Sequence, residues 1–145
     1  MAPASSVLLD DRLLIEELLV GLAWGRRYPE IYTTSYWYYR ACRAAVAGAG
    51  GHLSGPFEQL PPHQQELAIL SLLDLRGDIA LPDPRTSVPA MAQIAGRHPK
   101  LNVLNLEAVA VAIVLSAEVW LSAPAAAGVL PEVLDAQDVR WKAVR

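Results

Sequence analysis

Two adjacent aspartates interrupt an apolar pattern near the start of the chain, in the stretch VLLDD at residues 7–11. Residues 7–9 have the character of a short buried strand, so Asp10 would stand where that strand ends. In a parallel sheet, functional groups collect at the carboxyl ends of the strands. Asp10, with Asp11 beside it, is therefore the first candidate for chemistry.

Glu107 is the second candidate, because it lies on the same helical face as Val103, Val111 and Val114. An apolar side chain is expected at such a position, and a buried carboxylate needs a partner, a proton or a cation. Carboxylates brought together from distant segments can hold Mg²⁺ or Mn²⁺, which favour oxygen ligands. The metal hypothesis takes Asp10 and Glu107 as the catalytic pair, with Asp11 as an auxiliary ligand.

Ordinary helix chemistry offers a second interpretation of the same residues. Aspartate accepts hydrogen bonds from the free amides of a first helical turn, so Asp10 and Asp11 could cap a helix. An acid such as Glu107 near the start of a helix is also favoured by the helix dipole. Residue type alone leaves both interpretations open.

The other polar and aromatic groups favour structural roles. The run Tyr36–Tyr39 could stack on bases, but such a run more often packs into a core or a subunit interface. Cys42 has no neighbouring catalytic pattern and is expected to be a small buried residue. Three histidines lack metal-ligand spacing and are expected at the surface: His52, His63 and His98.

Composition limits the class of protein. The 145 residues suit one domain, 1–145, and 53% of them are hydrophobic, with a mean hydropathy of +0.25. The longest apolar stretch, residues 108–117, is about half the length of a membrane span, so no membrane partner is expected. No secretory signal pattern is present and the single cysteine excludes an internal disulfide, which together favour the cytoplasm. A net charge of −3 gives no general attraction to nucleic acid, and the high apolar and aromatic content predicts a homodimer.

Hydrophobic periodicity predicts an alternation of strands and helices around one sheet. Strands are expected near Val7, Thr33, Val119 and Val139. Helices are expected over 12–20, 36–46, 63–75, 89–97 and 104–117, with a turn and short helix in 126–137. The proline-rich segments 48–63 and 80–89 are expected to be loops. This order implies a three-layer α/β domain with a mostly parallel central sheet flanked by helices, in which the apolar 104–117 helix lies in the middle.

Two segments resemble PIN-domain proteins, a family that includes the VapC-type toxins. VLLDDRLLIEELL, at 7–19, resembles the family's opening strand, which ends in an acid and leads into a helix. LNLEAVAVAIVLSAEVWLSA, at 104–123, is similar to the closing segment, in which an acid opens a central apolar helix and a strand follows. The resemblance implies a PIN-like fold and a Mg²⁺- or Mn²⁺-dependent ribonuclease with three or four clustered acids.

The acidic set that the resemblance implies is incomplete here. Asp10 and Glu107 match two of the family's acids, whereas Tyr39, or Tyr38, and Pro124 stand where two others belong. The resemblance therefore implies a PIN-like protein that is weak or inactive as a nuclease and acts by binding RNA or a protein partner, such as an antitoxin. The alternative is a metal-dependent ribonuclease of the toxin type, which would use Asp10, Asp11 and Glu107 as metal ligands.

Overall fold

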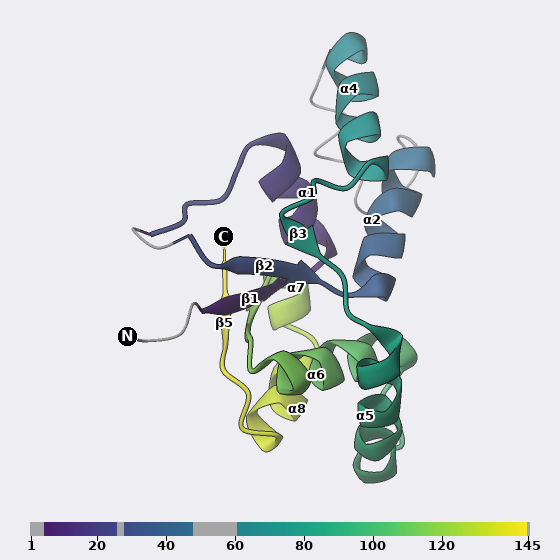
Figure 1. The fold of residues 1–145 in the computed structure, drawn as a ribbon, viewed down its shortest axis with the longest axis vertical. Helices are drawn as coiled ribbons and strands as arrows, with labels where there is room; N and C mark the ends of the chain where they lie inside the picture. Colours follow the sequence, from purple (N-terminus) through teal and green to yellow (C-terminus); the bar gives the residue numbers. More distant parts are fainter. Residues whose placement is uncertain (1–4, 26–27, 48–60, 145) are drawn as a thin grey trace.

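The architecture is a five-stranded, all-parallel sheet covered by helices on both faces (Figure 1). It is described by a computed structural model, which covers residues 5–25, 28–47 and 61–144. The strand order is β3-β2-β1-β4-β5. The strands are β1 (Ser6–Leu9), β2 (Glu30–Thr33), β3 (Ile79–Ala80), β4 (Glu118–Leu121) and β5 (Trp141–Ala143). The helices are α1 (Asp11–Leu19), α2 (Ser35–Ala47), α4 (Pro62–Leu73), α5 (Pro84–Arg97), α6 (Val103–Leu115), α7 (Ala123–Ala126) and α8 (Leu130–Ala136).

Alternation along the strands divides the core between two layers of helices. Val7 and Leu9 of β1 pack with α1, α2 and α4, whereas Leu8 packs on the opposite face with α5, α6 and α8. Successive side chains of a strand point to opposite faces, and each of these faces is covered by helices. Figure 1 shows α1, α2 and α4 above the strands and α5, α6 and α8 below them. The predicted three-layer α/β fold is confirmed.

Most predicted elements are present, with one correction around residues 80–89. That segment was expected to be a loop, with a helix starting at Pro89. Instead Ala80 belongs to β3, and α5 already begins at Pro84 behind the N-cap Asp83, so Pro89 lies inside the helix. Proline is well tolerated at the first helical position because its missing N–H needs no partner there. Of the expected 48–63 loop, residues 48–60 lie outside the described residues, and α4 begins at Pro62.

The apolar helix α6 is buried along its middle, as expected, and exposed at its ends. Its middle, residues 107–112, is buried. However, Val103, Ile113 and Val114 near its ends are 47%, 40% and 42% exposed. Six consecutive residues face every side of a helix, so the middle of α6 is enclosed all round and only its two ends reach solvent. None of the helices in the described part of the chain has the length and apolar content that crossing a lipid bilayer requires.

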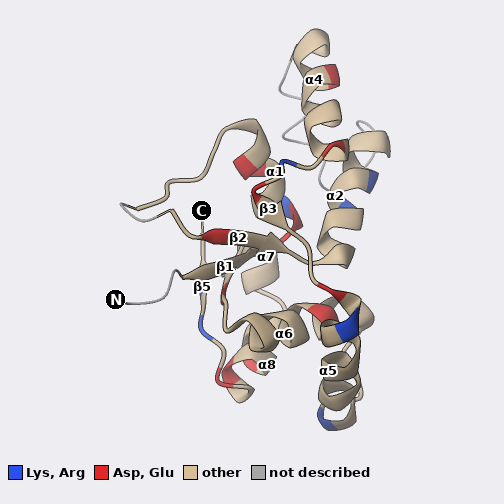
Figure 2. Ribbon diagram, viewed as in Figure 1, with Lys and Arg blue, Asp and Glu red and all other residues tan. Residues whose placement is uncertain are grey.

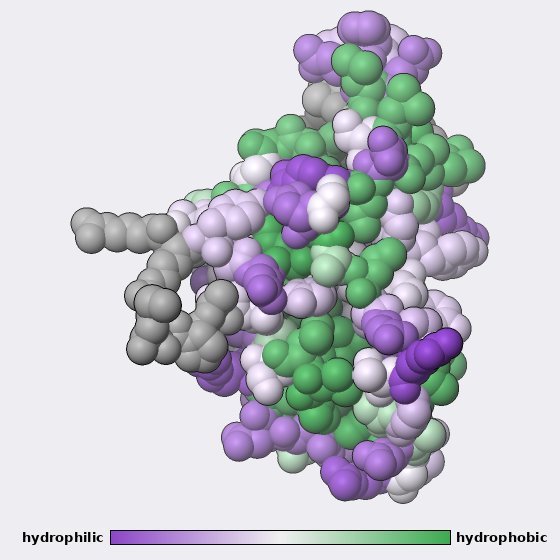
Figure 3. All heavy atoms as spheres, viewed as in Figure 1, coloured by the Kyte–Doolittle hydropathy of each residue, from purple (hydrophilic) through white to green (hydrophobic). Residues whose placement is uncertain are grey.

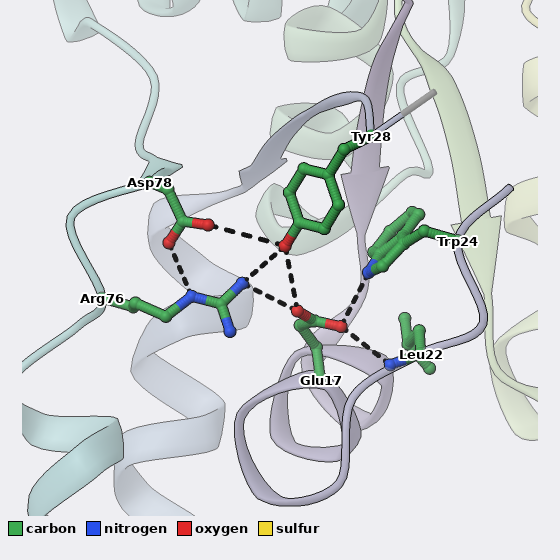
Figure 4. Close-up of polar contacts among 6 residues, drawn as sticks. All are labelled: Glu17, Leu22, Trp24, Tyr28, Arg76 and Asp78. Atoms are coloured by element: carbon green, nitrogen blue, oxygen red, sulfur yellow. Dashed lines mark hydrogen bonds and ion pairs between the residues drawn. The ribbon is translucent and has the colours of Figure 1, made fainter. Parts of the chain in front are cut away.

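A buried carboxylate near the end of α1 holds the following segment against the sheet (Figure 4). Glu17 accepts hydrogen bonds from the Leu22 amide at 2.8 Å and from Trp24 Nε1 at 2.9 Å. Its other oxygen accepts from Arg76 Nη2 at 2.7 Å and from the Tyr28 hydroxyl at 3.3 Å. Burial would raise the pKa of Glu17, but the hydrogen bonds from Leu22, Arg76 and Trp24 outweigh it, and the net shift is downward.

We expect Glu17→Gln to lower the free energy of unfolding by about 1–3 kcal/mol, because a charge-assisted bond to Arg76 and one acceptor oxygen are lost. A carboxyl with a lowered pKa stabilises the fold above its unfolded pKa, and this contribution is lost as the pH falls through the folded value. The difference from the native chain should therefore be largest above the ordinary value of 4.5 and shrink below it. Urea unfolding across this range measures it.

Glu16→Gln is the matched control, because its side chain is only half-buried on the same helix. It should change the free energy of unfolding by no more than about 0.5 kcal/mol, as usual for surface substitutions. Equal losses in the two variants would show that Glu17 contributes no more than an ordinary helix acid.

Candidate functional site at the carboxyl edge of the sheet

Asp10 joins the carboxyl ends of β1 and β4. Its Oδ1 accepts the Leu13 amide at 2.9 Å, which makes it the N-cap of α1. Its Oδ2 accepts both the amide and the hydroxyl of Ser122, at 2.8 and 2.6 Å. The side chain is fully buried, and burial raises its pKa despite the opposing hydrogen bonds from Ser122 and Leu13. The capping interpretation is thus confirmed for Asp10, with a second, long-range role in addition.

Asp11, the first residue of α1, faces an arginine. Its Oδ1 accepts the Arg12 amide at 2.9 Å, and its Oδ2 lies 3.1 Å from Arg40 Nε on α2. Burial, together with the charge of Asp10, raises the pKa of Asp11, and Arg40 opposes this. The Oδ2 atom is buried and accepts no hydrogen bond of adequate geometry from the described residues. Asp11 therefore has one incompletely satisfied oxygen.

Glu107 of α6 caps a neighbouring helix. Its Oε1 accepts the Tyr36 amide at 2.8 Å and its Oε2 accepts the Ser35 amide at 3.1 Å, so the carboxylate covers the start of α2. The residue is only 4% exposed. An acid is favoured at a helix N-terminus because the free amides there carry partial positive charge. The expectation that Glu107 serves the start of its own helix is wrong, because the first turn of α6 contains no acid; the helix start that Glu107 covers is that of α2.

Both acids of the proposed pair lie at the carboxyl edge of the sheet, since α1 follows β1 and α2 follows β2. Each of their four oxygens, however, already accepts a hydrogen bond from the protein. Within the described residues, no three His, Cys, Asp or Glu side chains form a group that could hold a metal ion. The donor set in this arrangement therefore does not fit a divalent cation.

The two positions where the family resemblance places further acids contribute none. Tyr39 is 59% exposed on α2, and the Tyr38 hydroxyl donates to the Leu72 carbonyl at 3.0 Å. Pro124 is exposed in α7 and borders a cavity described below. Within the aromatic run, Trp37 is 2% exposed and packs in the core as expected, whereas Tyr36 is 44% exposed.

A cavity of about 380 Å³ opens beside Asp11 at this edge. Its polar and charged lining is Asp11, Arg12, Arg40, Asn102, Asn105 and Ser122. Neither Asp10 nor Glu107 belongs to the lining, and the Arg40 guanidinium there is paired with Asp11. Elsewhere acidic and basic positions are interspersed along the ribbon (Figure 2). The cavity thus brings two arginines and one aspartate together in a chain whose net charge is −3.

Several residues at this edge escape sequence reasoning. Ser122 binds Asp10 from 112 positions away, and the cavity residue Asn102 is the N-cap of α6. The role of Asn102 could have been predicted, because asparagine is a favoured N-cap residue and Asn102 stands just before the expected apolar helix. Arg40 and Arg43 are arginines three positions apart on α2, and the sequence does not show which of them meets Asp11. Only the packing of α2 against α1 identifies Arg40.

Comparison with known proteins supports the fold. No protein-family model matches the sequence, and no curated protein matches it significantly. The chain is similar in structure to VapBC-1 from nontypeable Haemophilus influenzae, with a TM-score of 0.54 and 14% sequence identity. The match covers 95% of this chain and 97% of that chain. At this identity the likeness concerns the fold alone, and it agrees with the PIN-like architecture expected from the sequence.

Proposed function

We propose that the chain is a PIN-like binding domain with little or no metal-dependent ribonuclease activity. The observation that carries this proposal is the use of both matched acids as caps. Asp10 binds Leu13 and Ser122, and Glu107 binds the first amides of α2. Hydrolysis of RNA through metal ions needs carboxylates that concentrate those ions beside a phosphate. Here the oxygens stabilise the protein itself.

The ligand we propose first is RNA, bound at the carboxyl edge. The support is the cavity, where Arg12 and Arg40 supply positive charge and Asn102 and Asn105 supply amide groups. Arginine suits phosphate groups because its planar donors match their oxygens. A local site of this kind can bind RNA although the whole chain is acidic.

A protein partner of the antitoxin kind is the other proposed ligand. Leu67, Leu70 and Leu73 of α4 are 52%, 62% and 46% exposed, and Val46 of α2 is 72% exposed. Figure 3 shows apolar side chains reaching the surface in the part of the molecule formed by α2 and α4. Exposed apolar patches often mark protein contacts. The structural likeness to VapBC-1 adds support, and the same exposed residues are consistent with the homodimer expected from composition.

A second candidate function is the Mg²⁺- or Mn²⁺-dependent ribonuclease of the toxin type. One observation favours it, because Asp11 Oδ2 is a buried oxygen without a hydrogen-bond partner among the described residues. The Arg40 guanidinium already lies 3.1 Å from that oxygen, so a metal ion there would share it with Arg40 or displace Arg40. Mg²⁺ is normally held by one or two carboxylates together with waters and substrate phosphates. Asp11 alone would be the smallest protein ligand set of this kind.

Calorimetric titration with Mg²⁺ and with Mn²⁺ distinguishes the two candidates. We expect apparent dissociation constants of about 1 mM or weaker, because few accessible carboxylates remain. We also expect no cleavage of generic RNA in either metal. Asp10→Asn is the control, and it should leave the titration unchanged. Micromolar binding that Asp10→Asn abolishes, together with RNA cleavage lost in Asp10→Asn and in Glu107→Gln, would establish the ribonuclease instead.

A further inference from the structure

We propose that a second cavity, which lies between the connection from α5 to α6 and the helix α8, binds a small carboxylic acid with an apolar body. Its volume is about 520 Å³. Small-molecule sites in proteins commonly enclose about 300–1,000 Å³. The inference goes beyond the proposed function, because this cavity and the one beside Asp11 share only Val129 among their described lining residues.

Two segments that are distant in the sequence form the walls of this cavity. One wall is the end of α5 with the connection that follows it, and its polar residues are Arg97, His98 and Lys100. The other wall is one side of α8 with its N-cap, where the lining residues are three or four positions apart and include Val129, Glu132 and Val133. The cavity therefore combines charged groups with an apolar surface.

Apolar side chains form the floor of the cavity. Leu101 and Val133 are half-buried and pack against the core layer that contains α5, α6 and α8. Val129 is 60% exposed. Covering such side chains with hydrocarbon removes apolar surface from water, which is the main favourable contribution to this kind of binding. The floor therefore favours a ligand with an apolar body.

The charges that line the cavity favour an anionic group on that ligand. Arg97 and Lys100 are exposed, and neither forms an ion pair with another residue in the described part of the chain. Glu132 is the single carboxylate among the described residues that line the cavity. Cations are common near the end of a helix because the helix dipole favours them there. Beside an apolar floor, however, two such cations also match the carboxylate of an apolar acid.

His98 supplies a neutral donor on the same wall as the two cations. Arg97 Nη1 donates to Gln137 Oε1 at 3.3 Å, and the amide nitrogen of Gln137 lies 3.0 Å from His98 Nε2. Because an amide nitrogen only donates, Nε2 is the acceptor, and the hydrogen of the neutral ring is on Nδ1. Within the described residues no group accepts that hydrogen. A bound carboxylate can accept it.

Glu132 makes the site selective for a single negative charge. Its carboxylate belongs to the α8 wall, whereas Arg97 and Lys100 belong to the opposite wall. A ligand whose carboxylate is held by these cations extends its other end toward α8, where a second negative charge would meet Glu132. Like charges repel more strongly in a partly enclosed site than in bulk water. The preferred ligand is therefore a monocarboxylate, such as a short fatty acid.

The test is a titration of the isotope-labelled chain, followed by the NMR chemical shifts of its amides, with hexanoate, acetate, hexanol and hexanedioate as probes. We expect hexanoate to bind with a dissociation constant of about 1 mM, as its size permits, and to shift amides in 97–101 and 129–136. Acetate should bind about 10-fold or more weakly, because it lacks the methylenes that the floor buries. Hexanol, which has no charge, and hexanedioate, which meets Glu132, should each bind about 5-fold or more weakly than hexanoate.

Variants in the cavity assign the contacts. Lys100→Gln should weaken hexanoate binding by about 5-fold or more, because a charge-assisted contact is lost, and Arg97→Gln should act in the same direction. Arg85→Gln is the matched control, since Arg85 is exposed on α5 and does not line the cavity. Glu132→Gln should bring the affinity for hexanedioate to within about 2-fold of that for hexanoate. Thermal unfolding of each variant verifies that the fold is intact.

Two kinds of result would overturn the inference. If no probe shifts any amide, or if the shifts gather on the exposed leucines of α4, the cavity is not a binding site. If hexanol binds as tightly as hexanoate, or if Arg85→Gln weakens binding as much as Lys100→Gln, the cations only stabilise the end of α5 and no carboxylate is recognised. Neither result bears on the proposed function, which fails instead through the metal titration and RNA cleavage described above.

Discussion

Asp10→Ala should lower the free energy of unfolding by about 3–5 kcal/mol, the largest effect expected of any single substitution at the site. The Leu13 amide and both the amide and hydroxyl of Ser122 lose their acceptor together. Asp10 is fully buried, so water cannot easily replace it, and truncation also leaves a small cavity. Urea unfolding measures this loss, provided that the unfolding free energy falls with urea concentration at the same slope in the native and variant chains.

Asp83→Ala provides the matched control for this substitution. Asp83 is the N-cap of α5 and its carboxylate accepts the Arg85 amide at 2.9 Å, but it is exposed and binds no distant strand among the described residues. Loss of an ordinary cap costs about 1 kcal/mol. If Asp10→Ala costs no more than Asp83→Ala, the link between β1 and β4 through Ser122 contributes nothing.

Glu107→Gln should lower the free energy of unfolding by about 1–3 kcal/mol. Glutamine keeps the size of the side chain but replaces one acceptor oxygen with an NH₂ donor. One of the Ser35 and Tyr36 amides would then face another donor at the start of α2. Because the shape is conserved, the loss reports the hydrogen bond and charge rather than the packing. Thermal or urea unfolding at neutral pH measures it.

Glu132→Gln makes the same change at an exposed acid in the first turn of α8. It should alter the free energy of unfolding by no more than about 0.5 kcal/mol. A rise in stability on Glu107→Gln would instead mean that the carboxylate is strained in the folded protein, as acids held for a metal ion often are. The sign of the change in unfolding free energy therefore distinguishes a structural acceptor from an acid held for a metal ion.

Local residue types and hydrophobic spacing were sufficient to predict many of the strands and helices. The aspartates after residues 7–9 correctly marked the change from β1 to α1, because the N-cap chemistry of Asp10 is encoded by its neighbours. The helical spacing of α4 was equally readable. β3 was missed because two residues carry no periodicity, and α5 was started too late because Pro84 resembles a loop proline when it in fact opens a helix.

The candidate site was only half predictable. The types and places of Asp10, Asp11 and Glu107 could be read directly, but their partners lie far away in the sequence. Glu107 binds Tyr36, 71 positions away, and Asp11 meets Arg40 through the packing of α1 against α2. Whether a carboxylate faces a cavity or a helix start depends on such packing. Sequence reasoning therefore found the acids but could not decide between cap and ligand.

The most direct test of the central claim, that Asp10 and Glu107 serve as structural acceptors and not as metal ligands, is urea unfolding of the native chain in EDTA and in millimolar Mg²⁺. An ion that binds only the folded state raises the free energy of unfolding, by about 2.7 kcal/mol at a hundredfold excess over its dissociation constant. We predict the same free energy in both buffers. A rise in Mg²⁺ that disappears in Asp10→Asn would contradict the account.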